Sequence, residues 1–340
     1  MITMRGFAAA ARPTVTAAFV ACLGACAPAP GGNAPATGPP NPFAGPATRE
    51  LPSQARTGPR ALPPRLYGVT ADDVSNVGQI VASSRNLPET PVTRIYLDVT
   101  RPVGYYKTAI SGLHPVSYLM GELLDSSDEQ RIGTAAFGER VRSFLAAYGK
   151  QIDIWEIGNE VNGSWTGPYQ DVAAKLITAY KEVTARHGRT ALTLYDDTGC
   201  GNGPGELDPI TFTRAFVPPA VRGGLTYVFL SYYEGDCDGI RPGAGTWTAY
   251  FEALHAVYPR ARLGFGEIGL DHPVTRQTMS TAKSMLSYYY GLPVHLPYYA
   301  GGYFWWYYYE DCLPYDTEPL WRALRAAVSS GRRLAGTPGR

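Results

Sequence analysis

The stretch IDIWEIGNE, residues 152–160, is an apolar β-type run that ends in two polar residues, Asn159 and Glu160. Strands that are apolar almost throughout are typical of parallel sheets with both faces buried. Similar runs recur between Leu62 and about Val328. The predicted strands are Arg65–Val69, Arg94–Val99, Pro115–Met120, Ile152–Ile157, Ala191–Tyr195, Thr226–Ser231, Arg262–Phe265 and Gly302–Trp306.

Longer stretches of helical character separate these runs. In Asp171–Arg186, for example, apolar residues recur at steps of three and four. Eight strands alternating with helices match an α/β (β/α)8 barrel, or TIM barrel, which typically has about 250 residues. The competing architecture, a doubly wound open sheet, more often carries a glycine-rich turn after its first strand. The sequence has no such turn there, so we predict a single-domain TIM barrel at residues 62–330.

The N-terminal segment has the layout of a secretory signal. Arg5 and Arg12 precede the apolar run Val15–Leu23, which is too short to span a membrane. The sequence LGAC, which ends at Cys26, resembles a bacterial lipobox, in which the cysteine is lipidated. We predict a signal peptide at residues 1–25 and lipidation at Cys26; the alternative is a plain signal peptide cleaved nearby.

Residues 26–61 are rich in Pro, Gly and Ala, so they cannot bury enough apolar surface to offset their ordering entropy. We predict a disordered tether there and a disordered tail at residues 331–340. We expect the mature protein to be an exported, membrane-anchored lipoprotein, either periplasmic or on the cell surface. The alternative is a secreted protein. We expect it to be a monomer.

Composition excludes several classes of partner and cofactor. With 30 basic and 29 acidic residues, the chain lacks the basic excess of a nucleic-acid binder. Its five histidines form no His-Glu-x-x-His motif, and the acidic loop 234–239 lacks EF-hand spacing, so we predict neither metal nor cofactor. Cys200 and Cys237 follow consecutive predicted strands and are the favoured disulfide pair, which leaves Cys312 over.

Two predicted strands end in a carboxylate. The fourth ends at Glu160, and the seventh, continued as LGFGEIG over residues 263–269, carries Glu267. A carboxylate that is buried at the end of an apolar strand costs desolvation free energy unless it has ion-pair or hydrogen-bond partners. Such a group is therefore a candidate for a catalytic role. Barrel enzymes keep their reactive groups at the C-terminal ends of strands. Most glycoside hydrolases use a pair of carboxyl groups that flank the bond to be cleaved, so two carboxylates at the same end of one barrel are consistent with this chemistry.

The stretch WEIGNE, residues 155–160, resembles the fourth-strand motif of clan A glycoside hydrolases, in which an Asn-Glu pair ends the strand. The resemblance implies that Glu160 is the acid/base, that Asn159 binds the sugar 2-hydroxyl and that Glu267 is the nucleophile. The two glutamates stand 107 positions apart, a plausible length for three βα units. Clan members often have proline after the pair; here it is Val161, which leaves the particular family open.

The same resemblance implies supporting residues. Clan members often carry a strand-six aromatic that contacts the nucleophile, a role open to Tyr233 or Tyr232. They often place a strand-eight tryptophan beneath the sugar, for which we choose Trp305 over Trp306. They also have a strand-two arginine near the nucleophile, matched by Arg94, unless Arg94 instead forms a structural ion pair with Glu156.

Two further candidates come from the residues themselves. Trp165 lies in the loop after Glu160, and broad aromatic faces stack well on sugar rings. Asp196 follows the fifth predicted strand, where a carboxylate can bind sugar hydroxyls. Packing and solvation are the alternatives for both.

These features together predict a retaining glycoside hydrolase that cleaves an oligo- or polysaccharide by double displacement. A catalytically silent carbohydrate-binding lipoprotein on the same barrel is one alternative, since a fold does not guarantee chemistry. A transglycosylase, which uses the same residues with a sugar in place of water, is another.

Overall fold

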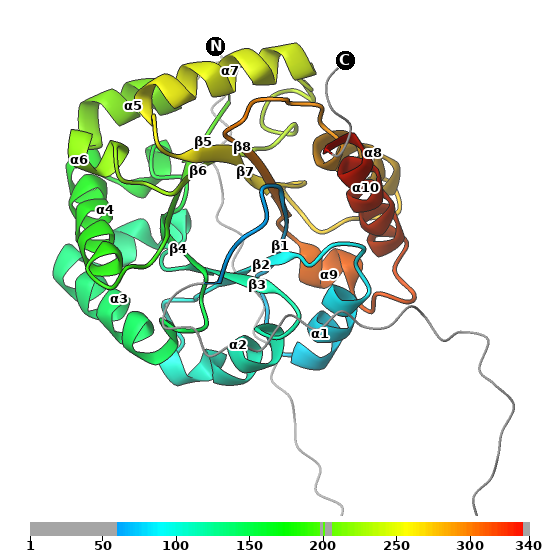
Figure 1. Cartoon of the computed structure of the whole chain (residues 1–340), viewed down its shortest axis with the longest axis horizontal. Coiled ribbons are helices and arrows are strands. Elements are labelled where there is room, and N and C mark those ends of the chain that lie inside the picture. Colours follow the sequence, from blue (N-terminus) through cyan, green and yellow to red (C-terminus); the bar gives the residue numbers. More distant parts are fainter. Residues whose placement is uncertain (1–59, 198–199, 201–205, 336–340) are drawn as a thin grey trace, which may run out of the picture. The chain divides into compact units, whose positions relative to one another are not determined.

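The computed structural model describes residues 60–197, 200 and 206–335, all within one compact unit. Eight parallel strands close into a barrel in sequence order, with β8 returning to pair with β1 (Figure 1). The TIM barrel is thus confirmed and the open sheet is excluded. The strands are β1 (Leu66–Ala71), β2 (Val92–Tyr96), β3 (Tyr118–Glu122), β4 (Ile154–Gly158), β5 (Thr190–Tyr195), β6 (Tyr227–Tyr232), β7 (Arg262–Ile268) and β8 (Tyr299–Trp305).

Helices surround the barrel in Figure 1, and the main apolar core lies between them and the strands. A smaller cluster, with Leu66, Ile154 and Phe229 among its members, is buried separately. The α-helices are α1 (Val77–Arg85), α2 (Lys107–Leu113), α3 (Thr134–Tyr148), α4 (Tyr169–Thr184), α5 (Pro209–Phe216), α6 (Pro219–Arg222), α7 (Ala244–Val257), α8 (Met279–Tyr290), α9 (Tyr308–Cys312) and α10 (Pro319–Ala335). Short 3-10 turns follow three of the strands: η1 (Val103–Tyr106), η2 (Ser126–Arg131) and η3 (Ser164–Thr166).

Each predicted strand is present, but some limits differ. Strand β7 continues to Ile268, so Glu267 lies within the strand, and β3 ends at Glu122 rather than at Met120. Residues 331–335 are helical, so the predicted tail begins too early. Within this segment, Gly331 lets α10 pack closely on the end of α8, because a side chain there would collide with the backbone carbonyl of Tyr290.

The disulfide between Cys200 and Cys237 is present, as predicted, and Cys312 is a buried free thiol. Among the described residues, no helix is long and apolar enough to cross a membrane. The predicted signal peptide, the lipidation site Cys26 and most of the tether lie outside the described residues.

Candidate active site

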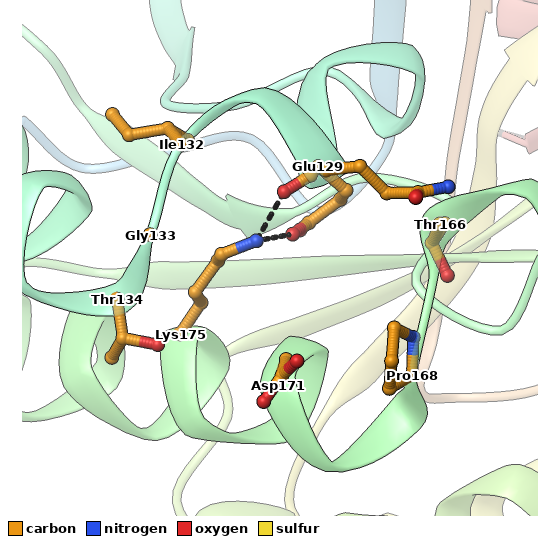
Figure 2. A pocket seen from close by; sticks show the side chains of 9 residues that line it. Glu129, Ile132, Gly133, Thr134, Thr166, Pro168, Asp171 and Lys175 are labelled. Atoms are coloured by element: carbon orange, nitrogen blue, oxygen red, sulfur yellow. Dashed lines mark hydrogen bonds and ion pairs between the residues drawn. The ribbon is translucent and has the colours of Figure 1, made fainter.

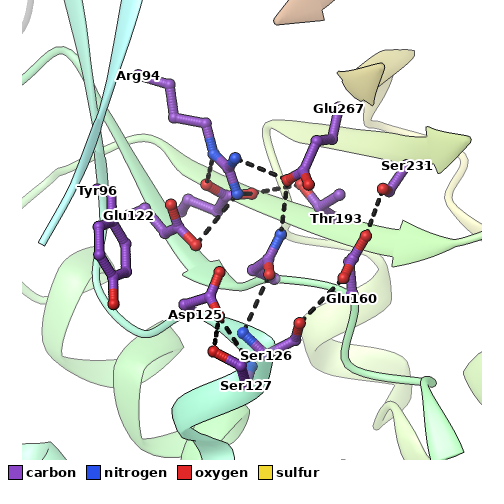
Figure 3. Close-up of polar contacts among 12 residues, drawn as sticks. Arg94, Tyr96, Glu122, Asp125, Ser126, Ser127, Glu160, Thr193, Ser231 and Glu267 are labelled. Carbon is purple, nitrogen blue, oxygen red and sulfur yellow. Dashed lines mark hydrogen bonds and ion pairs between the residues drawn. The ribbon is translucent and has the colours of Figure 1, made fainter. Parts of the chain in front are cut away.

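A single buried guanidinium holds three carboxylates together at the barrel centre (Figure 3). Arg94 on β2 is fully buried and lies 2.6 Å from Glu156, 2.7 Å from Glu267 and 3.2 Å from Glu122. These carboxylates come from β4, β7 and β3. Arg94 therefore contacts Glu267 and also forms the ion pair with Glu156.

Glu267 is surrounded by donors that stabilise its ionised form. Arg94 Nη1 and Asn159 Nδ2 donate to its Oε2 at 2.7 and 3.4 Å, and the Tyr233 hydroxyl donates to Oε1 at 2.5 Å. Burial raises the pKa of Glu267, while Arg94 and the Tyr233 hydrogen bond act in the opposite direction. The pKa of Glu267 remains above its ordinary value, but these donors favour the ionised form and offset part of the effect of burial.

Glu160 has the opposite environment. The Ser126 hydroxyl donates to its Oε2 at 2.9 Å and the Ser231 hydroxyl to its Oε1, but among the described residues no lysine or arginine pairs with it. Burial and the neighbouring charge of Glu267 raise the pKa of Glu160 well above its ordinary value. The surroundings of Glu160 therefore favour its protonated form more than those of Glu267 do.

The backbone at Glu160 is strained, which is a common feature of reactive positions. Its φ of 45° lies in the left-handed region, which residues other than glycine seldom occupy. Neighbouring contacts hold this conformation: Asn159 Oδ1 accepts from the Ser126 backbone N–H at 3.1 Å, while the Ser126 hydroxyl binds Glu160. A continuous path through Ser126 and Asn159 thus joins Glu160 to Glu267.

Two aromatic assignments need correction. The Tyr232 hydroxyl donates to the Ile240 carbonyl at 2.9 Å, and its ring packs edge-on against Trp247, outside the barrel. Successive strand residues point to opposite faces, so only Tyr233 reaches the site. Trp305 is also directed away: it is fully buried, and its indole N–H donates to Asp311 at 2.8 Å.

Trp306, rather than Trp305, lies next to the carboxylate network. Its half-buried ring lies 5.3 Å from the Arg94 guanidinium and 6.4 Å from the Tyr96 ring. Strand β8 has positive φ at four consecutive residues, Gly301 to Phe304, so simple alternation fails there. That irregularity explains why the sequence pattern selected the wrong tryptophan.

The remaining predicted residues lie on the loops around the pair. Trp165 lies in η3 with 39% of its surface exposed. Asp196 is buried just after β5, where its backbone N–H donates to the carbonyl of Ser231, the residue that binds Glu160.

Sequence reasoning missed several polar residues of the network. Glu122 ends β3 and had a detectable signal, because it is a carboxylate just past a predicted strand. Thr193, whose hydroxyl donates to Glu156, and the serines Ser126 and Ser231 have none, since isolated hydroxyl residues are common in any strand or loop.

A polar pocket of about 380 Å³ lies between η2 and the start of α4 (Figure 2). Its wall contains a buried ion pair in which Lys175 Nζ lies 2.7 Å from a carboxylate oxygen of Glu129 and also contacts the Glu129 carbonyl. This pair ties η2, whose first residue is Ser126, to α4. Among the residues that the structure describes, no group of three or more His, Cys, Asp or Glu side chains is arranged to hold a metal ion.

Replacing Glu122 tests whether this carboxyl group is protonated or ionised beside Arg94 in the folded protein. Within the described chain, neither of its oxygens accepts a hydrogen bond, and burial raises its pKa well above the ordinary value. A folded-state pKa above the unfolded one means that stability falls as pH rises from the unfolded value through the folded value. Glutamine resembles the protonated acid. We therefore expect the melting temperature of Glu122→Gln to match wild type near pH 4 and to equal or exceed it at pH 8.

Arg94→Met is the contrasting variant, because it leaves buried carboxylates without their cation. We expect it to cost about 3–5 kcal/mol of unfolding free energy. A Glu122→Gln protein as destabilised as Arg94→Met at pH 8 would show that Glu122 is ionised in the fold. Thermal unfolding of the three proteins across this pH range provides the measurement.

Comparison with known proteins places the fold. No model of a known protein family matches the sequence, and no curated protein matches it. Among solved structures, the barrel is similar to a glycoside hydrolase family 10 xylanase from Bispora sp. MEY-1 bound to xylobiose. That match has a TM-score of 0.53 and 11% identity and covers 77% of this chain and 96% of the xylanase.

A second similar structure is a glycoside hydrolase family 5 enzyme from Prevotella bryantii B14 in complex with a xyloglucan tetradecasaccharide. Its TM-score is 0.50 at 11% identity, with 77% of this chain and 95% of that enzyme covered. At such identities the likeness concerns the fold. The chain shares the (β/α)8-barrel fold of clan A-like glycoside hydrolases.

Proposed function

We propose that the protein is a retaining glycoside hydrolase with Glu267 as nucleophile and Glu160 as acid/base. One observation carries the proposal: two buried carboxyl groups in one network have opposite surroundings. Glu267 has a cation, a phenol and an amide as donors, whereas Glu160 has two hydroxyls. Separated proton affinities of this kind let one carboxyl group act as an acid while its neighbour acts as a nucleophile.

In the first step, Glu160 gives its proton to the glycosidic oxygen as the bond from that oxygen to the anomeric carbon breaks. The Glu267 carboxylate attacks the anomeric carbon, and a glycosyl ester forms on Glu267. In the second step, the Glu160 carboxylate takes a proton from water, and the water oxygen displaces Glu267 from the anomeric carbon. Both glutamates return to their starting states, and the sugar keeps its configuration.

The other residues position the nucleophile and the sugar. Arg94 and Tyr233 bind different oxygens of Glu267 and so fix the plane of its carboxylate. Asn159, whose amide lies between Glu267 and Ser126, is available to the sugar 2-hydroxyl. Trp306, stacked over Arg94, supplies an apolar surface beneath the ring.

The substrate that we propose is an oligo- or polysaccharide. The two similar structures were solved with xylobiose and with a xyloglucan, which supports a carbohydrate without naming the sugar. A transglycosylase uses the same residues and differs in the acceptor of the second step. A silent binding protein is less well supported, because both glutamates and their partners are in place.

We also propose that the enzyme is exported and tethered to a membrane through a lipid on Cys26. The support is the LGAC sequence after an apolar run and the Pro/Gly/Ala-rich segment that follows it. Metabolic labelling with a palmitate analogue tests this, because Cys26→Ser should lose the label and leave the membrane fraction. Labelling of the Cys26→Ser protein would refute it.

An activity screen tests the proposed function. Wild type is assayed beside a Glu160→Ala/Glu267→Ala double variant on a panel of polysaccharides and aryl glycosides, and the configuration of the first product is read by proton NMR. We expect wild type alone to release sugar, with retained configuration. Inverted product, or equal activity in the double variant, would refute the mechanism.

A further inference from the structure

The loop that follows Glu160 presents an exposed but firmly held indole. Trp165 has 39% of its surface exposed, yet a Cβ placed on Gly163 would lie 2.5 Å from its ring, so the indole rests directly on the loop backbone. Gln130 from η2 donates to the Trp165 carbonyl at 2.8 Å. An immobilised aromatic ring that remains open to solvent is already ordered for binding.

A second aromatic ring adjoins it. Tyr195, at the end of β5, lies edge-on to Trp165, with ring centroids 5.0 Å apart at an angle of 82°. Its hydroxyl donates to Asp236 at 3.0 Å, and Asp236 precedes the disulfide-bonded Cys237. The loops after β4, β5 and β6 thus hold this pair together.

The pair is also fixed relative to Glu160. Asn162, two residues after Glu160, accepts a hydrogen bond from the Tyr195 backbone N–H and donates to the Tyr195 carbonyl, both at 2.8 Å. Tyr195 is the register partner of Ser231 on β6, whose hydroxyl binds Glu160. Trp165 and Tyr195 therefore lie on the Glu160 side of the site, whereas Trp306 lies over Arg94.

We propose that Trp165, supported edge-on by Tyr195, forms a platform for the leaving-group sugar, so that the enzyme acts on glycosides whose leaving group is itself a sugar. This inference rests on the proposed function: Glu160 protonates the leaving oxygen, so rings beside Glu160 face the departing unit. The Asp236 carboxylate, at the edge of the platform, is available to hydroxyls of that sugar. Aromatic faces favour such partly apolar rings.

The experiment compares two leaving groups on one sugar. Oligosaccharides of glucose, xylose, mannose, galactose and N-acetylglucosamine are assayed beside the α and β glycosyl fluorides of the same sugars. Fluoride needs no platform. We expect Trp165→Ala to lower kcat/KM for the cleaved oligosaccharide about tenfold or more. The same variant should change turnover of the fluoride less than twofold. Trp165→Phe, which keeps an aromatic ring, should recover part of the lost oligosaccharide activity.

Tyr105→Ala is the matched control, because Tyr105 is equally exposed, at 40%, but lies in η1 after β2. It should leave the ratio of the two rates unchanged. Equal losses on both substrates in Trp165→Ala, or no loss on either, would overturn the platform alone. Wild-type turnover of fluorides without oligosaccharides would overturn both the platform and the proposed oligosaccharide substrate, but not the two catalytic glutamates. No turnover in the whole panel would overturn the proposed function as well.

Discussion

Replacing Glu267 with alanine is expected to lower turnover of every substrate that wild type cleaves by several orders of magnitude. The variant has no group to attack the anomeric carbon, and the Arg94 and Tyr233 donors lose the charge that they bind. Initial rates on the best substrate of the screen, measured at saturating and low concentrations, provide the comparison.

Sodium azide supplies the control for that variant, because a small anion can enter the space left by the carboxylate. Added azide should restore cleavage of an activated aryl glycoside and yield a glycosyl azide of inverted configuration. Tyr233→Phe, which keeps the nucleophile and removes one donor, should retain far more activity than Glu267→Ala. Full turnover by Glu267→Ala would remove Glu267 from the mechanism.

Replacing Glu160 with alanine is expected to slow cleavage of an unactivated oligosaccharide by about 10²–10⁴-fold, the usual contribution of a general acid. Formation of the glycosyl enzyme from a glycosyl fluoride should be nearly unaffected, since fluoride leaves without a proton. Glu160→Gln keeps an acceptor for the Ser126 and Ser231 hydroxyls but cannot donate a proton. It should therefore be as slow as the alanine variant on oligosaccharides.

The pH profile gives an independent readout of the same residue. Glu160 must be protonated in the first step, so wild-type activity should fall as pH rises through its raised pKa. Glu267 must be ionised, so activity should also fall as pH drops through the pKa of Glu267. With an oligosaccharide, the residual activity of Glu160→Ala should lack the alkaline limb and keep the acid limb, because no acid is left at that position to lose its proton. An unchanged alkaline limb in that variant would assign it to another group.

The sequence supported the fold because buried parallel strands leave a readable mark. In β4 and β7, apolar runs end in carboxylates, and closure of the barrel brings these ends to the same side. The Cys200–Cys237 disulfide was predictable for a related reason, since the loops after β5 and β6 are neighbours.

What the sequence could not supply is orientation. Tyr232 and Tyr233 are adjacent residues of the same type, and the sequence alone does not show which of the two side chains points into the barrel. Trp305 and Trp306 were misassigned because the positive φ angles in β8 break the alternation on which the inference relied. Glu122 escaped notice because the predicted strand stopped at Met120, two residues short of the carboxylate that joins Arg94.

The most direct test of the whole account is covalent. An activated 2-deoxy-2-fluoro glycoside of the sugar found in the screen slows the second step more than the first, so a glycosyl enzyme accumulates. We predict that digestion and mass spectrometry will find one sugar on the peptide that contains Glu267, and none on the same peptide from Glu267→Ala. A sugar attached to a different residue in the active wild-type enzyme would contradict the assignment.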